Sequence, residues 1–109
     1  MVYFIGAGPG DPQRLTIKGK KYIDRADVII YAGSLVNEHV LDDRKPEAVV
    51  YNSAYMHLDE VIGVMKEAEA AGLMTARVHT GDPSIFGAVR EQMDALDALH
   101  IPYEVIPGV

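Results

Sequence analysis

Two Gly-Asp-Pro tripeptides, at residues 10–12 and 81–83, constrain the fold of this chain more than any other feature. Each follows a short apolar run and precedes a helical pattern. Glycine permits a tight turn, the aspartate accepts hydrogen bonds from the first free N–H groups of a helix, and proline at the first helical position loses no needed donor. One interpretation is that both tripeptides are ordinary helix starts with no further role. Two similar loops at the carboxyl edge of a parallel sheet, where ligands bind in open α/β sheets, are the more specific prediction.

Apolar runs and helical periodicity alternate along the whole chain. We expect strands at residues 2–5, 28–31, 48–51, 74–79 and 103–106, and helices at residues 12–25, 35–41, 58–71 and 83–99, with Gly72 as a C-terminal cap. Connections of this length suit right-handed crossovers, so the pattern predicts a five-stranded, mostly parallel α/β sheet with helices on both faces, in a single domain over residues 1–109. The last strand has no closing helix, so we expect this to be the front part of a longer protein.

Composition argues against several classes of function. The 109 residues contain no cysteine, which excludes disulfides, thiolate metal ligands and a cysteine nucleophile, and fits a reducing cytoplasm. A formal charge of −6 argues against a nucleic-acid partner. We expect no signal peptide and no membrane span, because no apolar run approaches the roughly 20 residues that a span needs. No histidines or acids have metal-ligand spacing, so we expect no protein-held metal.

The first loop resembles a dinucleotide-binding loop, but its residues favour another ligand. The run GAGPG at residues 6–10 puts Asp11 where the third glycine of G-x-G-x-x-G should stand, and Pro9 removes a backbone N–H. The second strand ends at Tyr31 without an acid for a ribose, since Asp27 lies at its other end. Two acidic loops repel phosphate and tolerate a cationic or zwitterionic ligand. S-adenosylmethionine, with a sulfonium, an amino group and no phosphate, fits that description.

Several motifs together resemble a known family. The runs that carry the resemblance are GAGPGDP at residues 6–12, ADV at 26–28, TGDP at 80–83 and PGV at 107–109. They resemble the amino-terminal domain of the tetrapyrrole (corrin/porphyrin) methyltransferases. YAGSLV at residues 31–36 and MHLDE at 56–60 are most similar to the branch that methylates C11 of precorrin-4 or cobalt-precorrin-4 in cobalamin biosynthesis. The resemblance spans essentially the whole chain and keeps the order of the motifs.

The resemblance implies a two-domain enzyme about twice this length, usually a homodimer, of which this chain is the cofactor-side domain. S-adenosylmethionine would lie in a trough between the domains and leave as S-adenosylhomocysteine. Carried over by motif, Pro9 would line the cofactor, Thr80, Gly81 and Asp82 would contact it, and Ile85 would lie just inside the next helix. The second domain is absent from this chain, so we do not expect turnover by the chain alone.

A few basic residues and histidines are candidates for contact with the substrate. Methyl transfer from a sulfonium depends mainly on orientation, so no residue is assigned as catalytic acid or base. A corrin precursor carries many carboxylates, and any cobalt would belong to it. Arg14 and Lys18, one helical turn apart, are candidate substrate cations, with solvated helix-face charges as the alternative. His57 is a further candidate, with a simple helix-entry role as its alternative, whereas His79 is better interpreted as a histidine satisfied at a strand end.

Two other functions stay open on the sequence alone. One is a doubly wound nucleotide-binding domain of dehydrogenase-like or regulatory type, which would need an acid after the second strand. The other is a domain that dimerises and binds nothing. Titration with S-adenosylhomocysteine and with NAD separates these hypotheses.

Overall fold

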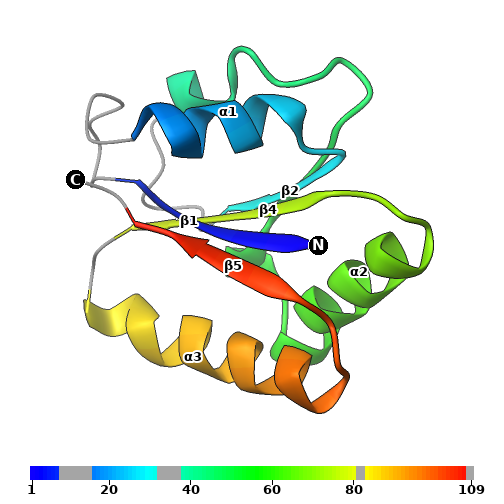
Figure 1. Ribbon diagram of the computed structural model, residues 1–109. Helices are drawn as coiled ribbons and strands as arrows, with labels where there is room; N and C mark the ends of the chain where they lie inside the picture. The colour runs from blue at the N-terminus through cyan, green and yellow to red at the C-terminus, as the bar shows by residue number, and fades with distance from the viewer. Residues whose placement is uncertain (8–15, 32–37, 81–82, 108–109) are drawn as a thin grey trace.

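Five parallel strands form one sheet with helices on both faces (Figure 1). The computed structural model describes residues 1–7, 16–31, 38–80 and 83–107. The strands are β1 (Val2–Ala7), β2 (Val28–Tyr31), β3 (Val49–Asn52), β4 (Thr75–Thr80) and β5 (Tyr103–Ile106), in the order β3-β2-β4-β1-β5. Every neighbouring pair runs parallel. The predicted α/β sheet is therefore confirmed.

The helices divide between the two faces of the sheet. Helix α1 (Ile17–Arg25) covers one face together with the 3-10 turn η2 (Glu38–Leu41). Helices α2 (Leu58–Ala70) and α3 (Pro83–Ala98) cover the other face, and the 3-10 turn η3 (Ser53–Tyr55) leads from β3 into α2 (Figure 1). Within the described ranges, none of these helices has the length and apolar character required to cross a membrane.

Two of the predicted helices need correction. The helix expected from Pro12 begins at Ile17, because Thr16 is extended (φ −71°, ψ 157°) and its side chain accepts a hydrogen bond from the backbone of Gly19 at 3.0 Å. This threonine satisfies a free donor of the first turn, as an N-cap does. The helix expected at residues 35–41 is, in its described part, the 3-10 turn η2. The second tripeptide behaves as predicted, since Pro83 is the first residue of α3.

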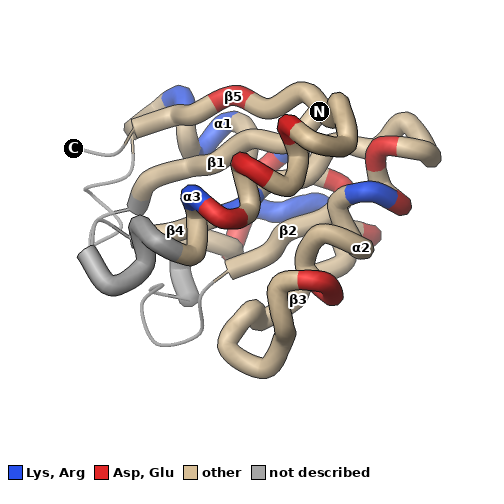
Figure 2. Tube along the Cα trace, turned by 90° about the horizontal axis from the view of Figure 1, so that it is seen from below, with Lys and Arg blue, Asp and Glu red and all other residues tan. Residues whose placement is uncertain are grey.

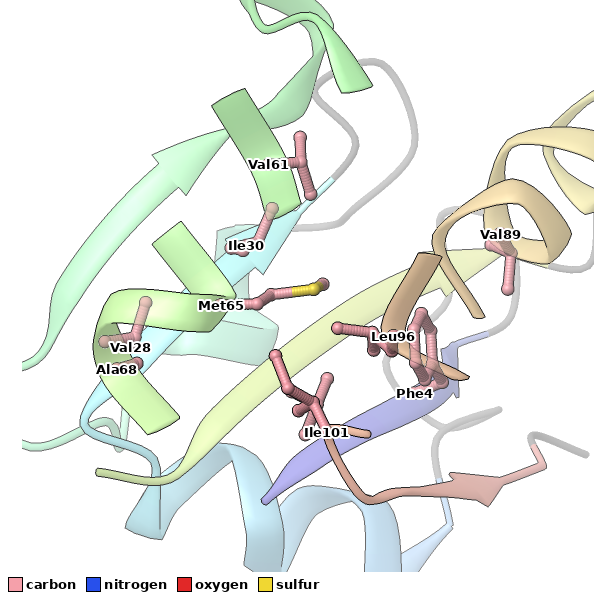
Figure 3. Close-up of a cluster of buried hydrophobic side chains, with 10 residues drawn as sticks. Phe4, Val28, Ile30, Val61, Met65, Ala68, Val89, Leu96 and Ile101 are labelled. Atoms are coloured by element: carbon pink, nitrogen blue, oxygen red, sulfur yellow. The ribbon is translucent and has the colours of Figure 1, made fainter. Parts of the chain in front are cut away.

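Alternating side chains of the strands form an apolar cluster on each face of the sheet. The cluster beneath α1 includes Ile5, Ile29 and Val78 from the strands and Ile23 from the helix. The cluster on the other face, drawn in Figure 3, joins β1, β2, α2 and α3. Its buried members are Val2, Phe4, Val28, Ile30, Val61, Met65, Ala68, Val89, Leu96 and Ile101. Helices on both sides thus hold the sheet through separate cores.

Helix α2 ends in the glycine cap predicted from the sequence. Gly72 has a φ of +73°, its N–H donates to the carbonyl of Glu69 at 3.1 Å, and the N–H of Leu73 donates to the carbonyl of Ala68 at 2.9 Å. This pair of bonds is the Schellman motif, which satisfies the last carbonyls of a helix. Helix α3 ends with the same two bonds, but there the residue with positive φ is His100 (φ 57°).

Gly72→Ala is expected to lower the free energy of unfolding by about 1 kcal/mol, because alanine is strained at positive φ. A Cβ at residue 72 meets no atom within 4 Å, so the loss is conformational and not steric. Gly63→Ala is the matched control, since a Cβ there also meets nothing within 4 Å but the residue lies inside α2. It should raise the free energy of unfolding by about 0.5–1 kcal/mol. Urea unfolding followed by circular dichroism measures both, and shifts of the same sign would contradict the prediction.

Asp27 joins the starts of three strands at the amino edge of the sheet. Its carboxylate accepts hydrogen bonds from Nζ of Lys45 at 2.7 Å and from the backbone N–H of Met74 at 2.9 Å. Its carbonyl accepts from the N–H of Val49 at 3.0 Å. The hydrogen bond from Lys45, followed by that from Met74, lowers the pKa of Asp27. The ionised carboxylate therefore contributes to the stability of the fold.

Asp27→Asn is expected to lower the free energy of unfolding by about 1 kcal/mol at neutral pH. Because the folded pKa lies below the unfolded value near 3.9, this contribution is present above pH 4 and is lost as the pH falls through the folded pKa. The difference between wild type and variant should therefore shrink between about pH 5 and pH 2. Urea midpoints across that range test this, with Glu91→Gln, at an exposed carboxylate, as control. A pH-independent difference would refute the role of the ionised carboxylate.

Candidate functional site

The adjacent strands β1 and β4 end side by side at the carboxyl edge of the sheet. Gly6 pairs with His79, and Ala7 pairs with Thr80. The helix that follows β1 covers one face, and the helix that follows β4 covers the other (Figure 1). The chain thus has a topological switch point between β1 and β4, which is where open α/β sheets bind ligands. Both Gly-Asp-Pro tripeptides follow these two strands, so the prediction that they succeed parallel strands is confirmed.

In the sequence, the residues predicted to bind the cofactor lie at or shortly after the ends of β1 and β4. Thr80 is the last residue of β4 and Ile85 is the third residue of α3, and their side chains lie outside the described part of the structure. Pro9, Gly81 and Asp82 also lie outside the described residues. Only the strand and helix that flank Gly81 and Asp82 are placed, and ligand contacts by these five residues stay predictions.

His57 lies at the start of α2, which begins beyond the carboxyl end of β3. Its backbone N–H donates to the side chain of Glu60 at 3.1 Å, and its carbonyl accepts from the N–H of Glu60 at 3.0 Å. His57 therefore has the helix-entry role. Its side chain is exposed, as is that of nearby Tyr55, which is 86% exposed. Both are accessible, and the substrate role of His57 stays a prediction.

The predicted grouping of Arg14 with Lys18 on one helix face is wrong, because α1 begins only at Ile17, after the extended Thr16. Arg14 itself lies outside the described residues. Lys18 lies in the first turn of α1, where its Nζ is 3.5 Å from a carboxylate oxygen of Glu104 on β5. Both side chains of this pair are exposed, so the ion pair contributes little to stability. Substrate contacts by Arg14 and Lys18 remain predictions.

Helix α1 is net basic, whereas α2 and α3 are net acidic. Helix α1 carries four basic residues and one acid, whereas α2 carries four acids and one base, and α3 three acids and one base. Figure 2 shows acidic positions spread over the face formed by α2 and α3. That face is unsuited to a ligand with many carboxylates, which would approach more favourably from the side of α1. In the described ranges, no group of three or more His, Cys, Asp or Glu is arranged to hold a metal ion.

Sequence reasoning missed a buried cation close to the site. Arg77 on β4 is 3% exposed, and its Nε donates to Oε1 of Gln92 on α3 at 3.0 Å. Burial lowers the pKa of Arg77 to about 10, so the side chain stays charged at neutral pH. His79, two residues further along, is also buried and interacts within the chain, and its interpretation as a satisfied strand-end histidine stays a prediction. The signal for Arg77 was a charged residue in the middle of a predicted buried strand.

Comparisons with known proteins place this fold among enzymes of one family. The family model for Tetrapyrrole (Corrin/Porphyrin) Methylases matches residues 1–109. The chain is 58% identical over 108 residues to the cobalt-precorrin-4 C(11)-methyltransferase of Methanocaldococcus jannaschii, covering 99% of this chain and 42% of that protein. It is 49% identical to the precorrin-4 C(11)-methyltransferase of Pseudomonas aeruginosa, covering 99% and 43%.

Solved structures of methyltransferases also match the fold of this chain. The X-ray structure of a cobalt precorrin-4 methyltransferase, described as a cobalamin biosynthetic enzyme, superposes with a TM-score of 0.90 at 47% identity, covering 99% of this chain and 45% of the other. A uroporphyrin-III C-methyl transferase from Thermus thermophilus, complexed with S-adenosylhomocysteine, matches with a TM-score of 0.77 at 35% identity, covering 99% and 44%. The chain spans less than half the length of these relatives.

Proposed function

The chain belongs to the tetrapyrrole (corrin/porphyrin) methylase family, and from this we propose that it is the amino-terminal, cofactor-side domain of a C11-methyltransferase of cobalamin biosynthesis. The enzyme would transfer a methyl group from S-adenosylmethionine to precorrin-4 or cobalt-precorrin-4. The observation that carries the proposal is the 58% identity with a cobalt-precorrin-4 C(11)-methyltransferase over nearly the whole chain. Since the chain spans 42% of that relative, a second domain is proposed to complete the site.

The cofactor side of the proposal rests on the switch point between β1 and β4. The loops that follow these strands carry Asp11 and Asp82. Two carboxylates at one sheet edge disfavour phosphate and favour a ligand with a sulfonium and an amino group. When bound, S-adenosylmethionine supplies a methyl group activated by a positively charged sulfur. Pro9, Thr80, Gly81, Asp82 and Ile85 are proposed to hold and orient it. The relative complexed with S-adenosylhomocysteine supports the use of this cofactor.

The catalytic contribution of this domain is proposed to be orientation and exclusion of water. The methyl carbon would bond to the ring carbon as its bond to sulfur breaks, so that the positive charge passes to the conjugated ring and the thioether product leaves uncharged. A ring carbon made electron-rich by conjugation needs no strong protein base, so alignment supplies most of the rate. His57, Arg14 and Lys18 are proposed to contact the substrate, whose carboxylates attract cations. A cytoplasmic homodimer is proposed for the whole enzyme.

A calorimetric titration of this chain with S-adenosylhomocysteine, with NAD in parallel, tests the proposal. We expect S-adenosylhomocysteine to bind and NAD to give no heat. Binding of NAD alone would favour the dehydrogenase-like domain, although β2 ends at Tyr31 without the acid that such a domain needs. If neither binds, this chain lacks cofactor affinity of its own. The full-length protein, assayed by mass spectrometry for one added methyl group on cobalt-precorrin-4, then decides on the reaction.

A further inference from the structure

The central strand β4 differs in chemistry between its two faces. Toward α1 it contributes Ala76 and Val78 to the apolar cluster. Toward α2 and α3 it presents Thr75, Arg77 and His79, all buried. The buried apolar side chains on that face come from β1, β2, the two helices and Ile101, which follows α3, as Figure 3 shows. Strands buried on both faces are usually aliphatic on both, so this polar row is not what packing alone would select.

Among these three residues, Arg77 is the one whose burial is least favourable in free energy, because its side chain is charged. It is 3% exposed, and its described partners are neutral, namely Oε1 of Gln92 at 3.0 Å and the carbonyl of Val78, which accepts from Nη1 at 3.1 Å. Among residues 1–7, 16–31, 38–80 and 83–107, no carboxylate forms an ion pair with this guanidinium. Burying a charge without an opposite charge is unfavourable, and an apolar side chain of similar size is often more stable. In the described part of the structure, the hydrogen bond to Gln92 is thus the side-chain contact that holds the guanidinium.

The bond between Arg77 and Gln92 links the two elements that flank the Gly81-Asp82 segment. Strand β4 ends at Thr80 and α3 begins at Pro83, so only two residues separate the linked elements. On α3, Gln92 stands between the buried apolar residues Val89 and Leu96. Apolar contacts are non-directional and tolerate sliding of a helix along a sheet. A hydrogen bond from a charged donor is directional and fixes the register.

We propose that Arg77 and Gln92 form a positioning pair, which holds α3 in register against β4 and thereby sets the Gly81-Asp82 segment for cofactor binding. This inference rests on the proposed function, because it assigns that segment to the cofactor. The pair acts through the backbone and touches neither cofactor nor substrate. It lies three residues before the end of β4 and nine residues beyond the start of α3.

The test compares stability with cofactor affinity. The double variant Arg77→Met/Gln92→Leu removes both polar partners and leaves an apolar pair of similar size, so it should unfold at or above the wild-type temperature. We expect it to bind S-adenosylhomocysteine on the order of tenfold more weakly. Gln92→Glu keeps an acceptor for Arg77 and should retain wild-type affinity. Thr75→Val, in the same buried row but at the far end of β4, is the matched control and should also bind normally.

A second readout needs no ligand. Amide 1H–15N chemical shifts of Gly81 and Ser84 in the unliganded chain should move in the double variant and stay in place in Thr75→Val. A stable double variant with unmoved amides, or with moved amides and wild-type affinity, would overturn the positioning role. If the wild-type chain does not bind S-adenosylhomocysteine, the same variants are compared in the full-length protein. If that protein does not bind it either, the proposed cofactor site fails and the amide shifts alone decide on the register. If the double variant does not fold, Arg77→Lys, which keeps the charge but not the forked geometry, is expected to give the same loss of affinity.

Discussion

Phe4→Ala is expected to lower the free energy of unfolding by about 3–5 kcal/mol. Phe4 is fully buried on β1, in the cluster between the sheet and helices α2 and α3 (Figure 3). Its ring also packs edge-to-face on Tyr103, with centroids 5.6 Å apart and an interplanar angle of 83°. Truncation removes the buried ring, leaves a cavity and breaks this aromatic pair. Since small domains are stable by about 5–15 kcal/mol, the loss is a large part of the total.

Chemical unfolding followed by circular dichroism measures this loss. Phe4→Leu keeps most of the volume and should cost less than about half as much. Val105→Ala, on the edge strand β5 where the side chain is 48% exposed, should change the free energy by no more than about 0.5 kcal/mol. A Phe4→Ala protein within 1 kcal/mol of wild type would mean that the cluster relaxes to fill the cavity, contrary to the prediction.

The strands could be predicted because most of them are short, locally apolar segments. The structure nevertheless extends β1 to Ala7, beyond the predicted end at Ile5, because Gly6 and Ala7 pair with β4. That pairing joins residues more than 70 positions apart, and no local pattern reports it. The order of the strands depends on the same kind of distant pairing.

Helix ends could be predicted only where a local signal was unambiguous. Gly72 is such a signal, since glycine is favoured at positive φ. The start of α1 was mistaken because Asp11 and Pro12 carry stronger start signals than Thr16, whose hydrogen bond to Gly19 decides the matter. His100 adopts the same positive φ without being glycine. There the packing of Ile101 against the core that contains Leu96 favours the cap, which is a tertiary cause.

The candidate site was predictable to the level of its loops and no further. Two tripeptides after apolar runs located the carboxyl ends of β1 and β4, because the turn chemistry is local. The partner of Lys18 is Glu104, 86 positions away, and that of Arg77 is Gln92 on the following helix. Such contacts depend on how elements pack, so a motif cannot reveal them.

Asp82→Ala in the full-length protein is expected to weaken affinity for S-adenosylhomocysteine at least tenfold, or by about 1.4 kcal/mol. Asp82 directly precedes α3, where a carboxylate accepts hydrogen bonds from first-turn N–H groups and is favoured by the helix dipole. The same charge is proposed to attract the amino group of the cofactor. Calorimetry on the purified protein gives the affinity. Asp94→Ala, at an exposed acid further along α3, is the matched control and should bind as wild type does.

Asp82→Asn separates the two roles of this side chain. Asparagine caps a helix about as well as aspartate, so the variant should keep the thermal stability of the wild type. It removes the negative charge, so it should still lose cofactor affinity, and more for S-adenosylmethionine, which carries the sulfonium, than for S-adenosylhomocysteine. Equal losses for the two ligands would assign Asp82 to the amino group alone. Unchanged affinity in Asp82→Ala would remove Asp82 from the site, and the switch point would then bind its ligand through the backbone of the loops.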